Sequence, residues 1–178
     1  MTRILLARHS QSFANKRDFA AFGNIDSPLT ERGIEQSHGI GREFEQRHGI
    51  TPATYGKPVL ASEYRRPQET AEVAGFTEIH TSPLINEADV DREIMSGLDV
   101  IQKHTEERWV AEEIRPRAAE FIDRVQSGEL DYEIYFTHGM FIASVLLECD
   151  ARSIATGAQF DAQRGYVPLQ ATIIPITL

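Results

Sequence analysis

Three short apolar runs, each followed at once by charged or polar residues, constrain the fold of this chain more than any other feature. The runs are Ile4–Ala7, Pro58–Ser62 and Tyr132–Phe136. Each is too short and too uniformly apolar for a helix and is typical of a strand buried on both faces of a sheet. Segments with helical character lie between them. Strands that alternate with helices predict an α/β domain with a mainly parallel central sheet in a three-layer α/β/α arrangement.

Helix signals after the first run support this alternation. Thr30 is placed to cap a helix in which Ile34, Ile40 and Phe44 fall roughly on one face, and Gly49 marks the end of that helix. We therefore expect this helix to pack on the sheet through that face.

The remainder of the chain continues the pattern. Pro67 suits the first turn of a helix after the second run, and residues 79–85 predict another short strand. Apolar residues recur at helical spacing over residues 105–125, where Pro116 is expected to kink or split the helix. The last segment, ATIIPITL, predicts a final strand, and Pro175 places that strand at an edge of the sheet.

Length and composition predict a single domain over residues 1–178. A chain of this length with 41% hydrophobic residues can bury a sizeable core without disulfides, and its one cysteine, Cys149, lies in an apolar run typical of a buried small residue.

The N-terminus resembles no secretory signal, and no run of about 18 apolar residues occurs, so we expect a soluble cytoplasmic protein with no membrane partner. The formal net charge of −9 argues against nucleic acid as a partner. Nothing in the sequence indicates an oligomeric state.

Residues suited to binding phosphate follow each of the three apolar runs. They are Arg8 and His9 after the first run, Arg65 and Arg66 after the second, and His138 with Gly139 after the third. Because the carboxyl ends of parallel strands lie along one edge of a sheet, we expect these side chains to meet in one pocket there. The backbone N–H groups that begin the helix after His138 can also donate to an anion.

Five segments of the chain resemble, in order, the motifs of the histidine phosphatase superfamily, also called phosphoglycerate mutase-like. They are ILLARHSQSFAN, DSPLTERGIEQ, SEYRRPQETAE, LINE and FTHG. The resemblance implies the fold of that family. It also places the family's phosphate-holding arginine on Arg66 rather than Arg65, its acid on Glu87 and its second histidine on His138. Ser10 stands where the family usually has glycine, so it adds a side chain where the backbone approaches the phosphoryl group.

The resemblance also implies a reaction. His9 would attack phosphorus and form a phosphohistidine that water then hydrolyses, with no metal ion and no cofactor. Phosphoryl transfer spreads negative charge over the phosphoryl oxygens, and Arg8, Arg66 and His138 are the groups expected to hold them.

Proton transfer to the leaving group requires an acid, and Glu87 is the residue expected to supply it, with Asp89 and Asp91 as alternatives. Further residues are expected to bind the substrate. They are Ser10, Ser12, Asn15 and Gly139.

Other functions stay open at this point. A phosphoglycerate-type mutase would return the phosphoryl group to the substrate, but such enzymes usually carry longer insertions than a 178-residue chain accommodates. A noncatalytic module would bind a phosphorylated ligand without turnover. A metal site built from His9, His138 and Glu87 would be opposed by the adjacent arginines. For an enzyme, a small phosphorylated metabolite is favoured over a phosphoprotein, with specificity set by residues 13–25 and 88–104.

Overall fold

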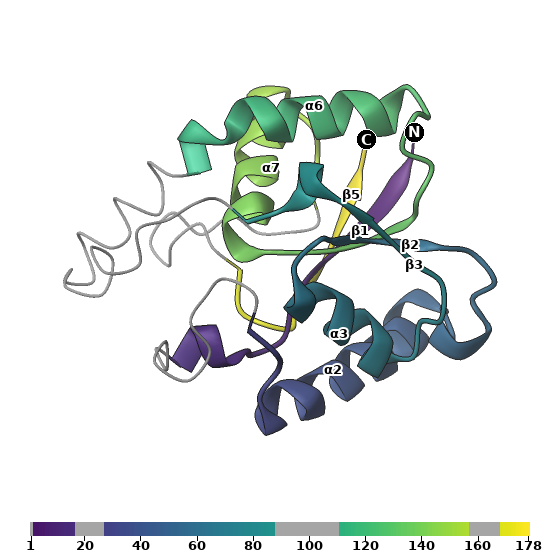
Figure 1. The fold of residues 1–178 in the computed structure, drawn as a ribbon. Coiled ribbons are helices and arrows are strands. Elements are labelled where there is room, and N and C mark those ends of the chain that lie inside the picture. Colours follow the sequence, from purple (N-terminus) through teal and green to yellow (C-terminus); the bar gives the residue numbers. More distant parts are fainter. Residues whose placement is uncertain (1, 17–26, 88–110, 157–167) are drawn as a thin grey trace.

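The computed structural model of the chain describes residues 2–16, 27–87, 111–156 and 168–178, and its centre is a five-stranded sheet (Figure 1). The strands are β1 (Arg3–Arg8), β2 (Val59–Ser62), β3 (Ile79–Ser82), β4 (Ile134–Thr137) and β5 (Ile173–Thr177). Their order across the sheet is β3-β2-β4-β1-β5. All neighbouring pairs are parallel except β1 and β5, which are antiparallel. The predicted mainly parallel sheet is confirmed.

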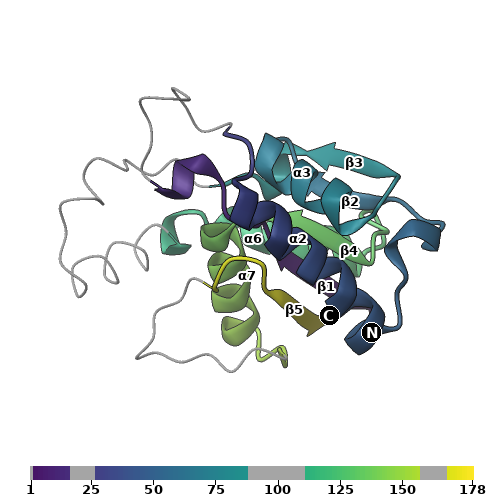
Figure 2. The ribbon, with the colours of Figure 1, turned by 90° about the horizontal axis from the view of Figure 1, so that it is seen from below.

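Helices cover both faces of this sheet. The α-helices are α2 (Glu31–Glu43), α3 (Arg65–Ala74), α6 (Arg115–Gln126) and α7 (Gly139–Ala151). Short helical turns are η1 (Phe13–Lys16), η2 (Phe44–His48), η3 (Pro52–Thr54) and η4 (Pro83–Ile85). Helices α2 and α3 lie on one face and α6 and α7 on the other, as Figures 1 and 2 show. The three-layer α/β/α prediction is therefore confirmed. None of the described helices has the length and apolarity needed to cross a bilayer.

Burial of β1 on both faces explains why its sequence is continuously apolar. Leu5 and Ala7 belong to the core cluster beneath α2 and α3, whereas Ile4 and Leu6 belong to the cluster beneath α6 and α7. All four are fully buried. Because successive strand residues point to opposite faces, a strand covered on both sides has no position for a polar residue until it ends.

The other four strands do not reach the full extent predicted from the sequence, and two of them differ most. Strand β4 begins at Ile134 rather than Tyr132. Strand β3 ends at Ser82, because Pro83 opens the η4 turn and has no N–H to continue the sheet. The final strand lies at an edge as predicted, and Pro175 sits opposite Leu5 of β1. Pro116 is confirmed as an interruption, since it stands in the first turn of α6.

The prediction for the inner face of α2 is wrong at one position. Thr30 caps the helix by accepting a hydrogen bond from the Gly33 N–H, as expected, and Ile40 and Phe44 are buried. Ile34, however, is 42% exposed. The buried face of α2 is built at the start of the helix by small residues, Gly33 first, and Ile34 lies about 100° away from Gly33 around the axis.

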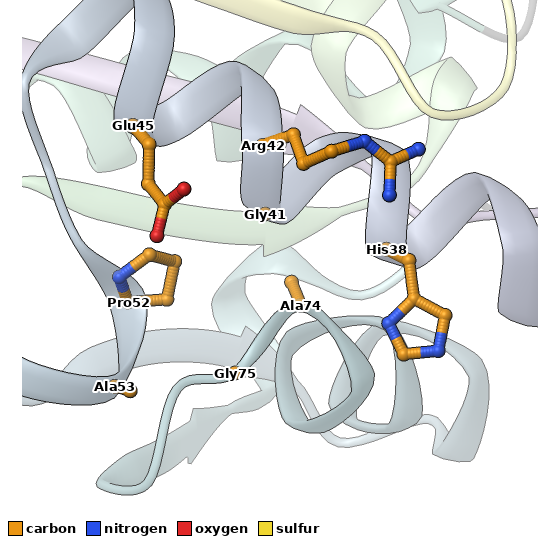
Figure 3. A pocket seen from close by; sticks show the side chains of 8 residues that line it. All are labelled: His38, Gly41, Arg42, Glu45, Pro52, Ala53, Ala74 and Gly75. Atoms are coloured by element: carbon orange, nitrogen blue, oxygen red, sulfur yellow. The ribbon is translucent and has the colours of Figure 1, made fainter.

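Close contact between α2 and α3 depends on a glycine. A Cβ on Gly41 would lie 2.5 Å from the carbonyl oxygen of Ala74, at the place shown in Figure 3. We expect Gly41→Ala to lower the free energy of unfolding by about 1–3 kcal/mol through overpacking. Gly39→Ala, in the same helix, meets only the Arg42 guanidinium at 3.8 Å and should raise stability by about 0.5–1 kcal/mol. Urea unfolding of both variants checks this, and equal effects of the two substitutions would refute the packing assignment.

Cys149 is fully buried, as predicted, and burial raises the pKa of its thiol to about 11. At pH 8 about one thiol in a thousand is then ionised in the folded protein, and only the thiolate reacts with disulfide reagents. We expect the native protein to resist labelling by a chromogenic disulfide and to react with one equivalent once it is unfolded in guanidinium. Full labelling of the native protein within minutes would contradict this.

Candidate active site

Two of the predicted site residues follow neighbouring parallel strands. His9 comes directly after β1 and His138 directly after β4, and the register pairs Arg8 with Thr137. The His9 N–H donates to the Thr137 carbonyl oxygen at 2.9 Å, which continues the strand pairing by one residue. The two imidazole centroids are 5.1 Å apart in an edge-to-face arrangement. The predicted meeting of these histidines at the edge of the sheet is observed.

Arg66 joins the two imidazoles. It lies in the first turn of α3, which follows β2, and it is 1% exposed. Its Nε donates to His9 Nε2 at 3.1 Å, and its Nη2 is 3.0 Å from His138 Nδ1. Burying a guanidinium is costly unless its donors are satisfied. A buried cation held between two imidazoles is an arrangement suited to binding an anion.

The tautomer of His9 follows from its backbone partner. Its Nδ1 lies 2.7 Å from the Ser10 carbonyl oxygen, which can only accept, so Nδ1 carries the proton. Nε2 therefore keeps its lone pair in the ring plane, directed toward the Arg66 donor. This is the orientation that a nucleophilic imidazole requires.

Glu87 lies beside the second histidine. One of its carboxylate oxygens is 4.0 Å from His138 Nδ1, and its side chain is 12% exposed. His9, Arg66, His138 and Glu87 are thus gathered at one place, although they come from four separate segments of the chain. Asp89 and Asp91, the alternative acids, lie outside the described residues, as do most of the two segments expected to set specificity.

Ser10 forms hydrogen bonds to side chains of α2 and α3. The Ser10 N–H donates to Thr70 Oγ1 of α3 at 3.0 Å, and its hydroxyl accepts from Ser37 of α2 at 2.8 Å. Thr70 donates in turn to the Arg66 carbonyl oxygen at 2.7 Å. Ser10 is fully buried, and its extra side chain is accommodated by the helix layer beneath the loop.

The first turn of α2 fixes the next residue of the same loop. Thr30 donates its N–H to the Gln11 carbonyl oxygen and its hydroxyl to Gln11 Oε1, both at 3.0 Å. The Gln36 side chain accepts from the Gln11 N–H at 2.9 Å. A Cβ on Gly33 would lie 2.0 Å from the Gln11 carbonyl oxygen, so only glycine allows this approach. Residues 30–36 therefore support the loop that carries His9.

The remaining predicted residues have other partners. Ser12 donates its hydroxyl to Asn15 Oδ1 at 2.9 Å, so these two side chains contact each other. The Arg8 guanidinium, half-buried, donates to the Pro168 carbonyl oxygen. Gly139 is the first residue of α7, whose N-cap is His138, so the helix begins at the site as expected. Arg65 is exposed and forms an ion pair with Glu69 at 2.6 Å.

Sequence reasoning missed three residues that contact this site. Ser62, the last residue of β2, lies 2.8 Å from His138 Nε2. The Tyr64 ring is edge-on to His138 at 5.1 Å, and the Arg66 guanidinium carbon lies 5.2 Å from its centre. Asn86 accepts from Ser62 at 2.8 Å. Ser62 could have been found from the sequence, because it stands at the end of a predicted strand, where residues are expected to meet at one edge of the sheet. No spacing pattern in the sequence indicates Asn86.

The metal-site alternative gains no support. Within the part of the chain that the structure describes, no three His, Cys, Asp or Glu side chains form a group able to hold a metal ion.

Most of the sequence matches the model of one protein family. The sequence matches the histidine phosphatase superfamily (branch 1) over residues 4–167. A search of curated proteins gives no match.

Among solved structures, a candidate α-ribazole-5′-P phosphatase from Escherichia coli K-12 is 22% identical in sequence and has a TM-score of 0.64. The match covers 100% of this chain and 91% of the E. coli chain. The protein TTHB049 from Thermus thermophilus is 20% identical with a TM-score of 0.63, covering 98% and 92% of the two chains. A phosphoserine phosphatase from Entamoeba histolytica, in complex with 3-phosphoglyceric acid, is 18% identical with a TM-score of 0.60, covering 97% and 96%. At these identities the likeness shows a shared fold.

Proposed function

Because the chain belongs to the histidine phosphatase superfamily, we propose that it hydrolyses phosphomonoesters through a phosphohistidine intermediate on His9. The observation that carries the proposal is the buried Arg66 guanidinium, which donates to His9 Nε2 and lies 3.0 Å from His138 Nδ1. A phosphoryl group that reaches His9 Nε2 comes within range of the donors of Arg66. The positive charge of Arg66 and the proposed nucleophile, His9 Nε2, are therefore next to each other.

The first step transfers the phosphoryl group to the enzyme. The His9 Nε2 lone pair forms a bond to phosphorus while the bond from phosphorus to the ester oxygen breaks. The electron pair of that bond leaves with the alcohol oxygen, which takes a proton from Glu87. Throughout this step Nδ1–H keeps its hydrogen bond to the Ser10 carbonyl oxygen, which stabilises the ring as it gains positive character.

The second step returns the enzyme to its starting state. The Glu87 carboxylate accepts a proton from water as the water oxygen bonds to phosphorus and the bond from phosphorus to Nε2 breaks. Inorganic phosphate leaves, and Glu87 is again protonated for the next turnover.

Charge on the transferring group is held by fixed donors. We assign this role to Arg8, Arg66 and His138, together with the backbone N–H groups that begin α7 at Gly139. Two guanidinium groups supply the positive charge that a metal ion supplies in many phosphoryl-transfer enzymes, so the proposed reaction uses no metal and should survive EDTA. Ser10, Ser12 and Asn15 complete the proposed phosphate-binding loop.

The substrate class is a small phosphorylated metabolite. Support comes from Arg66, whose guanidinium contacts both His9 and His138 and can donate to a single phosphoryl group there, and from the E. histolytica neighbour, whose structure holds 3-phosphoglyceric acid. A panel of phosphorylated sugars, hydroxy acids, amino acids and nucleotides, assayed for free phosphate with EDTA present, tests the proposal. Turnover to free phosphate is the expected result. Transfer to a second alcohol without free phosphate would indicate a mutase, and binding without turnover across the panel would indicate a noncatalytic module.

A further inference from the structure

We infer that Ser62 and Asn86 are positioning residues that hold His138 in one tautomer, with its proton on Nε2 and its Nδ1 lone pair facing the site. This inference deepens the proposed function, on which its kinetic consequence rests. It derives from a chain of hydrogen bonds, here called the relay, that runs from Glu63 through Asn86 and Ser62 to the His138 imidazole. Each bond in the relay fixes the direction of the next.

The first link fixes the Asn86 amide. The Glu63 N–H, which can only donate, is 2.9 Å from Asn86 Oδ1, and Asn86 Nδ2 donates to the Glu63 carboxylate at 3.1 Å. Both contacts would be lost or repulsive if the amide were turned over. The oxygen of Asn86 therefore faces Ser62.

The second link fixes the Ser62 hydroxyl. Asn86 Oδ1 can only accept, so the single hydroxyl proton of Ser62 is directed to it at 2.8 Å. The oxygen lone pairs of Ser62 are left to accept, one from the Tyr64 N–H at 3.2 Å and one from His138 Nε2 at 2.8 Å. His138 Nε2 must therefore carry a proton.

The opposite side of the ring leads independently to the same tautomer. Arg66 Nη2, 3.0 Å from His138 Nδ1, has only N–H groups to offer, so a neutral His138 accepts there through its Nδ1 lone pair. His138 and Ser62 are both fully buried, so solvent does not compete for these positions. Two separate sets of partners, on opposite nitrogens, agree.

The consequence concerns where His138 can take up a proton. With Nε2 already protonated, a further proton must go to Nδ1, between Arg66 and the Glu87 carboxylate oxygen 4.0 Å away. That is the side on which the proposed phosphoryl group is bound. Because of the relay, any proton that His138 gains is added at Nδ1, on the side of the ring that faces the site. The new Nδ1–H can then donate to a phosphoryl oxygen.

The relay is anchored in the same stretch of chain as the proposed acid. Arg117 of α6 donates to the Asn86 carbonyl oxygen at 2.8 Å, and Thr137 of β4 donates its hydroxyl to the Ile85 carbonyl oxygen at 2.6 Å. Asn86 is adjacent to Glu87 in sequence. One short anchored segment therefore carries both the group that sets the tautomer of His138 and the group proposed to donate the proton.

Imidazole nitrogen NMR of ¹⁵N-histidine-labelled protein tests the inference without any substrate. Of the six histidines, the His138 signals are assigned by their loss in His138→Gln. We expect the neutral ring of the wild type to carry its proton on Nε2, with the Nε2–H signal protected from solvent exchange. In Ser62→Ala that signal should exchange at least about tenfold faster, since its acceptor is gone. Ser62→Thr, which keeps the hydroxyl, should retain protection.

Ser144→Ala is the matched control, because it removes another buried serine hydroxyl, one that donates to the Ala111 carbonyl oxygen at 2.8 Å. The control should leave the His138 signals unchanged. A wild-type ring protonated on Nδ1, or an Nε2–H signal equally protected in Ser62→Ala, would overturn the inference. The wild-type spectrum decides the tautomer even if a variant fails to fold.

Kinetics separate this inference from the proposed reaction. We expect Ser62→Ala and Asn86→Ala to lower kcat by about tenfold with a smaller change in KM, because the relay acts on a group that the transition state uses. If His138 has the predicted tautomer but the enzyme turns over no phosphomonoester, the relay is supported and the proposed function is refuted. If the enzyme is fully active but His138 has the opposite tautomer, the proposed function is supported and the relay is refuted.

Discussion

Replacing His9 with alanine is expected to lower kcat for a phosphomonoester by about a thousandfold or more, because the substitution removes the proposed nucleophile on which both proposed steps depend. The fold should persist, since His9 follows the end of β1 and its backbone N–H bond to Thr137 does not involve the ring. Phosphate release measured on the purified variant, beside a thermal unfolding curve, checks both statements.

The matched control for this substitution is His38→Ala, an exposed histidine of α2 that lines the cavity drawn in Figure 3 and lies outside the proposed site. It should retain wild-type turnover. A His9→Ala enzyme that keeps more than about a tenth of wild-type kcat would show that the reaction does not pass through this imidazole.

Arg66→Lys carries the second large effect. Lysine keeps the positive charge but cannot donate along two directions from one planar group, so it cannot satisfy both His9 Nε2 and His138 Nδ1. We expect kcat/KM to fall by about a hundredfold or more, since each lost charge-assisted hydrogen bond is worth about 1.5–3 kcal/mol. The measurement is steady-state kinetics with a phosphomonoester.

Arg65→Lys is a close control, because it changes the neighbouring residue of the same helix in the same way. Arg65 is exposed and its ion pair with Glu69 can be kept by lysine, so activity should change less than about twofold. Equal losses of activity in Arg65→Lys and Arg66→Lys would contradict the assignment of Arg66, and not Arg65, to the site.

The strand-end residues could be predicted because their placement follows from local rules. A short apolar run identifies a strand buried on both faces, and parallel strands bring whatever follows them to one edge. His9 and His138 are found together for this reason. Arg66 could not be separated from Arg65 by the same rule, since both follow β2. The resemblance selected Arg66, and the structure shows the physical difference: successive helix residues point about 100° apart, so one is buried and the other exposed.

Contacts between distant segments were not predictable from spacing. The Ser62–Asn86 bond joins residues 24 positions apart, and the Ser62–His138 bond joins residues 76 apart. No periodicity encodes such pairs. The error at Ile34 has a related cause, because the inner face of α2 is defined by how closely the Gln11 loop approaches Gly33, and side-chain hydrophobicity alone does not reveal that approach.

Ser10 illustrates how a departure from a family pattern is absorbed. The family resemblance implies that Ser10 adds a side chain where the backbone is expected to approach a phosphoryl group. In the structure its hydroxyl accepts from Ser37, while its carbonyl oxygen accepts from His9 Nδ1 and its N–H donates to Thr70. The group that orients the proposed nucleophile, His9, is the backbone carbonyl of Ser10, which a glycine would also supply.

Direct trapping of the phosphorylated enzyme is the most decisive measurement. Protein mixed with a ³²P-labelled substrate, quenched in alkali within milliseconds and digested, should yield an alkali-stable, acid-labile label on the peptide that contains His9, forming and decaying as fast as turnover requires. Rapid turnover with no labelled protein, or a label on the peptide that contains His138 in place of His9, would contradict the account.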